Sequence, residues 1–227
     1  IGTKFGKRTM GFITDMNQPL GNAVGNWVEV VEAVECLHGR VVPDLVELTC
    51  AFAGTMLMLG GKAATVQEGI EECKKVLASG RAYTKFLELV VQQGGDTKYI
   101  ENLEQYPYPK YSAEILSKHN GCVERIDALE IGLACIELGA GRKKIKDKID
   151  PNAGVVFRKK VGDTVDEGER VAIMHADCRE GMATAKSRIE AAIHIGSSKP
   201  EQRPLILSTI EIDDKNPEEI LVRPWKS

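Results

Sequence analysis

The sequence has no long hydrophobic run, no excess of basic residues and few aromatic side chains. Its richest apolar stretch, residues 51–60, is far shorter than the ~20 residues that a membrane-spanning helix requires. Lys and Arg number 30 against 33 Asp and Glu, which gives a formal net charge of −3. Such a balance provides neither the basic surface of a nucleic-acid-binding protein nor a polybasic membrane patch. We therefore expect no nucleic-acid partner and no membrane partner.

Metal-binding patterns of cysteine and histidine are also missing. The six cysteines are scattered, no two of them form a Cys-x-x-Cys pair, and the four histidines share no metal-ligand spacing. Free thiols buried in a reducing cytoplasm fit this distribution better than a zinc site or a disulfide framework, and we expect a cytoplasmic protein. No Ser-His-Asp or Cys-His arrangement is indicated. We assign no catalytic residue and no cofactor-binding residue.

The most informative stretch covers residues 9–32. It begins with an apolar run at 10–13, which predicts a buried strand. A polar loop containing Pro19 and Gly21 follows, and from Ala23 the apolar residues take the period of a helix. In open α/β sheets, ligands bind at the carboxyl ends of strands, beside helix N-termini. This loop is therefore a candidate site.

Several further helices are predicted after this stretch. Four of them share one start signal, an N-cap acceptor followed three residues later by Glu. The pairs are Asp44 and Glu47, Thr65 and Glu68, Asp127 and Glu130, and Asp177 and Glu180. With another helix at 82–92, residues 20–104 become almost entirely helical after a single strand. One strand cannot form a sheet, so we expect part of the domain to lie upstream of this sequence. The chain alone should then have an exposed sheet edge and an uncovered apolar surface.

The pattern of the sequence changes after residues 106–111, Tyr-Pro-Tyr-Pro-Lys-Tyr, where the prolines exclude helix. Aromatic residues in a segment that crosses between domains often fix it to a neighbouring element. Short strands with Gly-Asp turns are then mixed with helices. The strands are predicted at 113–117, 122–126, 154–157, 170–174 and 204–212, and the helices at 127–138 and 178–195. The predicted fold class is α/β. Residues 1–105 form the C-terminal part of an α/β domain, with one strand and several helices, and residues 106–227 form a small α+β module of barrel-sandwich type.

Three ordered motifs together resemble one enzyme family. Residues 13–26 read Ile-Thr-Asp-Met-Asn-Gln-Pro-Leu-Gly-Asn-Ala-Val-Gly-Asn, residues 137–142 read Glu-Leu-Gly-Ala-Gly-Arg, and residues 161–168 read Val-Gly-Asp-Thr-Val-Asp-Glu-Gly. They closely resemble the pyrimidine-nucleoside and thymidine phosphorylases, over nearly the whole chain but only over the C-terminal half of such an enzyme.

The resemblance implies a pentosyltransferase reaction with phosphate as co-substrate. Pyrimidine nucleoside and phosphate are converted reversibly to free base and pentose 1-phosphate, and the preference for thymidine or uridine stays open. The family's phosphate loop and the residues that hold the pyrimidine lie upstream, so the resemblance implies that this chain alone is inactive. It also implies that the parent enzyme is a homodimer.

A cation site is implied by the same resemblance. The ligands would be the main-chain carbonyls of Leu20 and Ala23 and the carboxylate of Glu32, and the ion would be a monovalent cation such as potassium. Such cations prefer oxygen ligands, and loop carbonyls are free of helical hydrogen bonds. From the residues alone, an acidic residue on a helix more often lies on a solvated face, and Glu29 and Glu35 are rival candidates.

Three further residues are candidates for lining the substrate cleft. Asp15 and Met16 follow the first predicted strand, where they would border a pyrimidine pocket, but Asp15 could equally cap turn amides and Met16 could pack. Arg142 follows a Gly-rich helix end and could approach the cleft on domain closure. Basic residues at such a position are more often explained by the helix dipole.

Residues 161–175 are also similar to the hairpin of biotinyl and lipoyl carrier domains. Those carriers present a modified Lys at a tight turn, commonly in Met-Lys-Met or Asp-Lys-Ala, and neither tripeptide occurs here. Lys118 lies near a turn without that context. The alternative functions are therefore a non-catalytic interaction or carrier module, and a related glycosyl- or phosphoribosyl-transferase.

Overall fold

The computed structural model describes residues 2–201, 203–212 and 220–225. The chain forms two compact units that are interleaved in sequence. The first, here called unit 1, comprises Ile1–Asp15, Val41–Tyr83 and Arg203–Ser227. The second, unit 2, comprises Met16–Arg40 and Thr84–Gln202. These units are discontinuous, unlike the two contiguous domains predicted at 1–105 and 106–227.

Unit 1 contains a three-stranded antiparallel sheet in the order β1-β9-β10. Strand β1 (Met10–Thr14) pairs with β9 (Ile206–Ile212), and β9 pairs on its other side with β10 (Ile220–Pro224). The predicted strands at 10–13 and 204–212 are thus confirmed, although the second completes the sheet of the first and does not belong to the module after residue 106. Within the described residues β1 and β10 are edge strands. The expectation that the first strand has no partner in this chain is wrong, because β1 pairs with β9.

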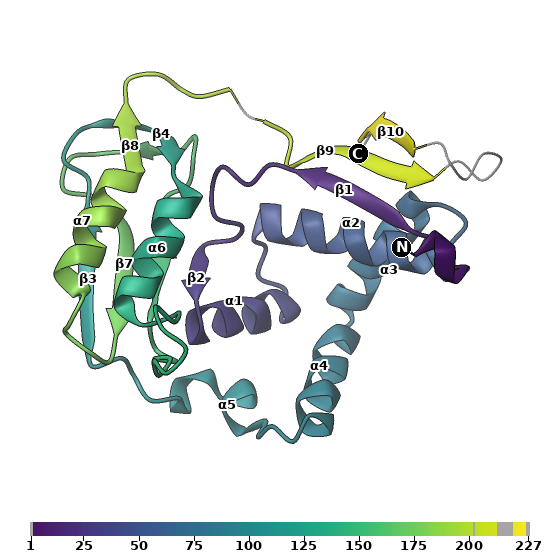
Figure 1. Ribbon diagram of the computed structural model, residues 1–227, viewed down its shortest axis with the longest axis horizontal. Helices are drawn as coiled ribbons and strands as arrows, with labels where there is room; N and C mark the ends of the chain where they lie inside the picture. The colour runs from purple at the N-terminus through teal and green to yellow at the C-terminus, as the bar shows by residue number, and fades with distance from the viewer. Residues whose placement is uncertain (1, 202, 213–219, 226–227) are drawn as a thin grey trace. The chain divides into compact units, whose positions relative to one another are not determined.

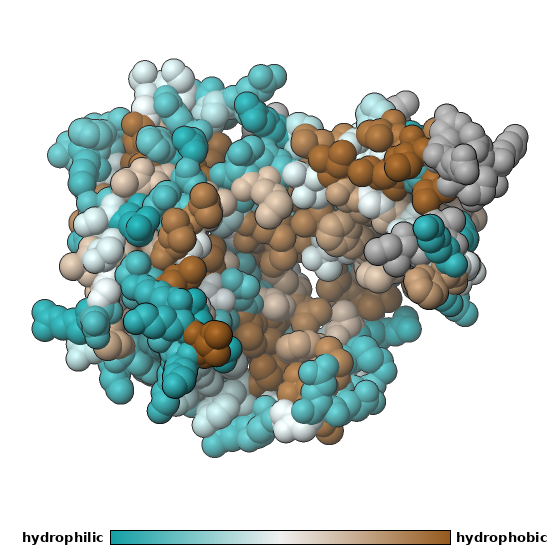
Figure 2. Space-filling view, in the orientation of Figure 1, coloured by the Kyte–Doolittle hydropathy of each residue, from teal (hydrophilic) through white to brown (hydrophobic). Residues whose placement is uncertain are grey.

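Helix α2 (Pro43–Leu59) lies along this sheet (Figure 1). The ring of Phe12 in β1 meets that of Phe52 in α2 edge to face, with the centroids 5.0 Å apart. Hydrophobic residues also gather on the outer surface over the three strands (Figure 2). The exposed apolar side chains of these three strands are Ile13, Leu207, Ile220 and Val222. The uncovered apolar surface that the sequence predicted is therefore present in unit 1.

Helices α2 and α3 (Val66–Ala78) approach each other very closely. A Cβ atom added to Gly69 would lie 2.4 Å from the carbonyl oxygen of Gly54, so glycine is required at this crossing. Helix α3 begins as predicted, because the Thr65 side chain accepts the N–H of Glu68 at 3.1 Å. The predicted cap at Asp44 is wrong, because Val42 is the N-cap of α2 and the helix begins at Pro43.

Unit 2 contains two further sheets, in the orders β2-β5-β7-β3 and β6-β4-β8. The strands are β2 (Ala23–Gly25), β3 (Tyr111–Leu116), β4 (Gly121–Ile126), β5 (Gly154–Phe157), β6 (Thr164–Val165), β7 (Arg170–Ala176) and β8 (Ile193–Gly196). The helices are α1 (Trp27–Leu37), most of α4 (Arg81–Gln92), α5 (Lys98–Glu101), α6 (Ala128–Leu138) and α7 (Met182–Ala192). Short 3₁₀ turns occur at Thr3–Phe5, in unit 1, and at Leu103–Gln105.

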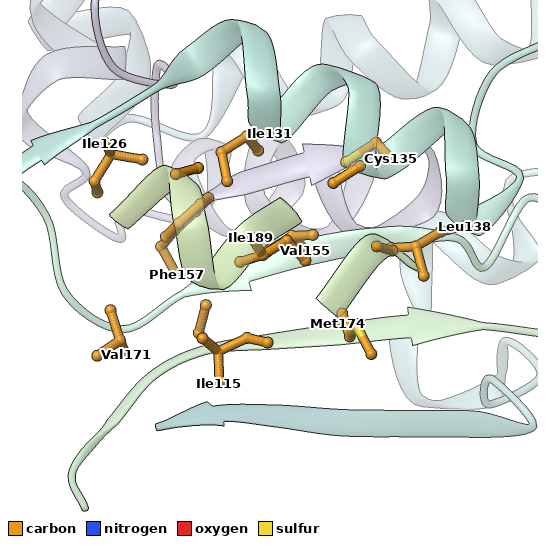
Figure 3. Close-up of a cluster of buried hydrophobic side chains, with 14 of the residues drawn as sticks. Ile115, Ile126, Ile131, Cys135, Leu138, Val155, Phe157, Val171, Met174 and Ile189 are labelled. Carbon is orange, nitrogen blue, oxygen red and sulfur yellow. The ribbon is translucent and has the colours of Figure 1, made fainter. Parts of the chain in front are cut away.

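The main hydrophobic core lies between α6, α7 and the strands of unit 2. Figure 3 shows Ile131, Cys135 and Leu138 of α6 near Val155 and Met174 of the sheet. All five side chains are buried, which explains the apolar periodicity of both kinds of element. The mixed α/β class is thus confirmed. None of the described helices combines the length and apolarity that crossing a bilayer would require.

Two predicted helix boundaries in unit 2 are wrong. The helix expected from Ala23 begins only at Trp27, because residues 23–25 pair with β5 as strand β2. The helix expected at 178–195 is α7, and its last predicted residues form β8, which pairs with β4. In both cases a strand partner distant in sequence overrides the local helical pattern. The predicted cap at Asp177 is also wrong, since Gly181 occupies the N-cap of α7.

The other start signal is confirmed. The Asp127 side chain accepts the N–H groups of Leu129 and Glu130 at the start of α6, and Gly139 ends this helix with a left-handed φ of 101°. These caps fix both ends of α6. The Gly-rich segment that carries Arg142 therefore leaves the helix at a defined point.

Candidate functional site

The polar loop predicted as a site joins β1 to β2. The chain passes from unit 1 to unit 2 at Asp15 and Met16, and the part in unit 2, residues 16–22, leads directly into β2. Pro19 and Gly21 are buried although the loop is polar. Gly21 has a φ of +67°, a left-handed conformation that favours glycine. The loop is thus a packed segment with a defined backbone.

Glu32 is the acidic residue of α1 that faces this loop. Its side chain is only 5% exposed, and its carboxylate oxygens accept the N–H of Asn22 at 3.0 and 3.1 Å and that of Ala23 at 3.2 Å. Hydrogen bonds to an ionised acceptor offset the cost of burying the charge. A solvated face is therefore excluded for Glu32.

The two rival acids have other partners. Glu29 is exposed and accepts the N–H of Gly25 at 2.8 Å. Glu35 forms an ion pair with Arg40. Of the three candidates, Glu32 alone is buried.

The carbonyl groups of the loop accept hydrogen bonds from a lysine side chain. The Lys160 ammonium donates to the carbonyl oxygens of Pro19 and Gly21, the latter at 2.5 Å. The Asn22 carbonyl accepts the N–H of Phe157 at 2.7 Å, beside the end of β5. Sequence reasoning missed Lys160, and the only sign in the sequence is its place just before the recognised Val-Gly-Asp turn.

The residue types at this loop fit a hard cation. Among the described residues, no group of three or more His, Cys, Asp or Glu side chains could hold a metal ion. A cation here would therefore depend on main-chain carbonyls with a single carboxylate, which suits a weakly bound monovalent ion. Glu32 provides a buried carboxylate against the backbone of Asn22 and Ala23. The Lys160 contacts show that neighbouring carbonyls accept positive charge.

The three predicted cleft residues lie in different surroundings. Asp15 belongs to unit 1, is half-buried and donates its backbone N–H to the carbonyl of Leu205 at 2.8 Å. Met16 and Arg142 belong to unit 2 and are exposed, Met16 by 80%. High exposure of Met16 argues against the interpretation that it packs in a core. Their roles as cleft residues stay predictions.

A second concave feature of unit 2 is a groove of about 730 Å³ between α1 and residues 100–109. The rings of Trp27 and Tyr106 stack there with centroids 3.9 Å apart, so the aromatic crossing segment is fixed to a neighbour as the sequence predicted. His175 also lines the groove, and its Nδ1 atom lies 2.8 Å from the Ser112 hydroxyl oxygen. Burial lowers the pKa of His175, and Arg158 lowers it further.

Other titratable groups of unit 2 have structural roles. Burial raises the pKa of the Cys135 thiol to about 12, so this cysteine is not a nucleophile. Hydrogen bonds from the Asn152 side chain and the Lys110 N–H lower the pKa of Asp177. Asp177, just after β7, thus binds Asn152 and the segment before β3 instead of capping α7. All six cysteines are free thiols. Cys50, Cys122 and Cys135 are buried, as the sequence predicted, whereas Cys178 is exposed.

Lys118, the only lysine considered for a carrier function, lies between β3 and β4. These strands belong to different sheets, so the turn does not close a hairpin of the carrier type. The Lys118 ammonium is 2.7 Å from the Glu190 carboxylate. Its surroundings therefore supply no argument for a modified lysine.

Comparison with known proteins gives matches in two parts of the chain. A family model described as the C-terminal domain of pyrimidine nucleoside phosphorylase matches residues 122–196. A model described as the a/b domain of a glycosyl transferase family matches residues 1–83.

Curated relatives match across both parts. A pyrimidine-nucleoside phosphorylase of Bacillus subtilis is 38% identical over 197 residues, which cover 87% of this chain and 45% of the relative. That of Staphylococcus haemolyticus is 37% identical over 195 residues, which cover 86% of this chain and 45% of the relative. That of Staphylococcus epidermidis is 38% identical over 180 residues, which cover 79% of this chain and 42% of the relative. The chain thus spans somewhat less than half the length of these relatives.

Proposed function

Because the chain belongs to the pyrimidine-nucleoside phosphorylase family, we propose that it forms part of an enzyme that cleaves pyrimidine nucleosides with phosphate. The products are the free base and a pentose 1-phosphate. The observation that carries the proposal is the ordered match of both family models, with relatives about 37% identical across most of the chain. The carrier-module alternative is not favoured by these matches.

In this proposal, the chain supplies a support for the reaction and not its main binding groups. Catalysis would come from orienting phosphate against the anomeric carbon and from stabilising the departing base. Asp15, Met16 and Arg142 are proposed as residues that border the cleft, and none is proposed as a catalytic acid or base.

A monovalent cation, such as potassium, is part of the proposal. Leu20 and Ala23 would hold it through their carbonyls and Glu32 through its carboxylate. A bound cation supplies positive charge that fixes the loop backbone. The buried Glu32 carboxylate, which already bonds the amides of Asn22 and Ala23, supports this assignment. We further propose a cytoplasmic, homodimeric parent enzyme, on the basis of the family resemblance and of the free cysteines.

A chimera tests the proposal. The C-terminal 45% of the Bacillus subtilis relative is replaced by this chain. The purified chimera is then supplied with uridine or thymidine, and base release is followed by chromatography. We expect release of uracil or thymine that depends on added phosphate. The chain alone and the remaining part of the relative alone are the controls, and neither should release base. A folded chimera without turnover would contradict the proposal.

A further inference from the structure

The loop between β1 and β2 is attached to the turn after β5 at several points. The Lys160 ammonium bonds the carbonyls of Pro19 and Gly21. Beside it, the Val161 N–H donates to the Gln18 side-chain oxygen at 3.4 Å. All of these residues belong to unit 2. Lys160 is therefore the centre of a contact between segments that lie 139 positions apart in the sequence.

The backbone of Lys160 is fixed before its side chain reaches the loop. Its N–H donates to the Asp163 carboxylate at 2.7 Å, and its carbonyl accepts the Asp163 N–H at 3.0 Å. On the other side of the contact, the left-handed φ of Gly21 sets the direction of its peptide group. Both partners are thus held by their own turns, so little backbone entropy is lost in forming this contact.

The loop is bonded by opposite charges on its two polar sides. Its carbonyls, the negative ends of the peptide dipoles, meet the Lys160 ammonium. Its amides at Asn22 and Ala23, the positive ends, meet the buried Glu32 carboxylate. Charge-assisted hydrogen bonds are stronger than neutral ones, and away from bulk water they are screened less by salt. The Lys160 and Glu32 contacts together therefore hold the loop backbone in one conformation.

We infer that Lys160 is a positioning residue that serves loop residues 18–22 as a tethered monovalent cation, with Glu32 as its anionic counterpart. The carbonyls of Pro19 and Gly21 form a binding site for a positive charge. A small free cation, ammonium or potassium, binds at this site when the lysine side chain is removed. The inference goes beyond the proposed function, and its test needs no nucleoside. Failure of the phosphorylase proposal would leave it standing.

Hydrogen exchange of the loop amides tests the inference. Lys160→Met removes the charge and keeps a long side chain, and Lys144→Met is the control at an exposed lysine. Exchange of peptides covering residues 17–26 is measured by mass spectrometry in tetramethylammonium, ammonium or potassium chloride at one concentration. In tetramethylammonium we expect faster exchange in Lys160→Met than in the parent. Ammonium or potassium should restore the protection. In each salt Lys144→Met should exchange like the parent. Any effect of ammonium or potassium on these two proteins, which the proposed site at Leu20, Ala23 and Glu32 would produce, should be smaller than the effect on Lys160→Met.

Two results would overturn the inference. One is a Lys160→Met protein that exchanges like the parent in tetramethylammonium. The other is an increase in exchange that small cations do not reverse, because the lysine would then act through packing alone.

A measurement on the unaltered chain decides the case if Lys160→Met does not fold. The amines of the folded chain are labelled with a small acylating reagent and quantified by peptide mapping. Engagement with two carbonyls should make Lys160 react several-fold more slowly than Lys144. Equal labelling rates would overturn the inference.

Discussion

At the scale of single residues, hydrogen bonding distinguishes two buried polar side chains. Thr55 in α2 is only 3% exposed, and its Oγ1 atom has no hydrogen-bond partner among the described residues. Glu32 is buried to a similar degree but accepts several N–H groups. The unsatisfied Thr55 hydroxyl therefore lowers the stability of the fold, whereas the Glu32 carboxylate stabilises the loop of the candidate site.

Replacing Thr55 tests this difference. Thr55→Val keeps the shape and removes the unsatisfied hydroxyl, so we expect the free energy of unfolding to rise by about 1 kcal/mol. Thr55→Ser keeps the hydroxyl and loses the methyl group, so it should be less stable than the parent. Urea denaturation measures both. A Thr55→Val protein less stable than the parent would show that the hydroxyl has a partner.

His175 predicts a pH dependence of stability. Its pKa is lowered in the folded state by burial and by Arg158, so the unfolded state binds the proton more readily. The stabilisation that depends on neutral His175 is present above the unfolded pKa and is lost as the pH falls through it, at about 6.5. The urea concentration at the midpoint of unfolding should therefore decrease as the pH is lowered from about 7.5 to about 5.5.

Two variants isolate this effect. His175→Gln should flatten the pH dependence, because the group that titrates is gone. His119→Gln, at an exposed histidine, should keep the dependence of the parent. A His175→Gln protein with an unchanged profile would assign the pH dependence to other groups.

The residue-scale features that the sequence predicted correctly are local ones. Thr65, Asp127 and Gly139 act within one helical turn, so their types and spacing suffice to identify them. Lys160 could not be found in this way, because its loop contacts lie about 140 positions upstream. The sequence alone does not distinguish a solvated lysine from one that binds a distant loop.

At the scale of elements, most helices were predictable, but the short strands β2 and β8 were not. Helices α3 and α6 carry their own start signals, and the predicted bounds of α4 and α6 agree with the structure within one residue. Strands β2 and β8 have three and four residues and were read as parts of helices. Their identity depends on β5 and β4, which lie far along the chain, so local propensity did not reveal them.

The crossing of α2 and α3 supplies a matched pair of glycine substitutions. Gly69→Ala places a methyl group about 2.4 Å from the Gly54 carbonyl oxygen, so the helices must separate. We expect a loss of about 1–3 kcal/mol in the free energy of unfolding. Gly132 in α6 has nothing within 4 Å of an added Cβ atom. Gly132→Ala should therefore stabilise the chain by about 0.5–1 kcal/mol. Thermal unfolding compares the two, and equal effects would contradict the close crossing.

At the scale of the whole molecule, the interleaved order of the two units is the feature that sequence reasoning missed. Strand β1 finds its partner in β9, almost 200 positions later, and β9 was assigned to the second domain. Periodicity identifies a strand but does not name its partner. The premise of a single unpaired strand was therefore wrong, because the partner of β1 lies in the same chain. The exposed apolar side chains of unit 1 were expected.

The fate of phosphate is the most direct test of the central claim, that this chain is part of a pyrimidine-nucleoside phosphorylase. The chimera with the Bacillus subtilis relative is incubated with uridine and inorganic phosphate, and phosphorus NMR follows the reaction. The account predicts that the inorganic phosphate signal is converted into that of a pentose 1-phosphate, in step with uracil release. Release of uracil with the phosphate signal unchanged would contradict it.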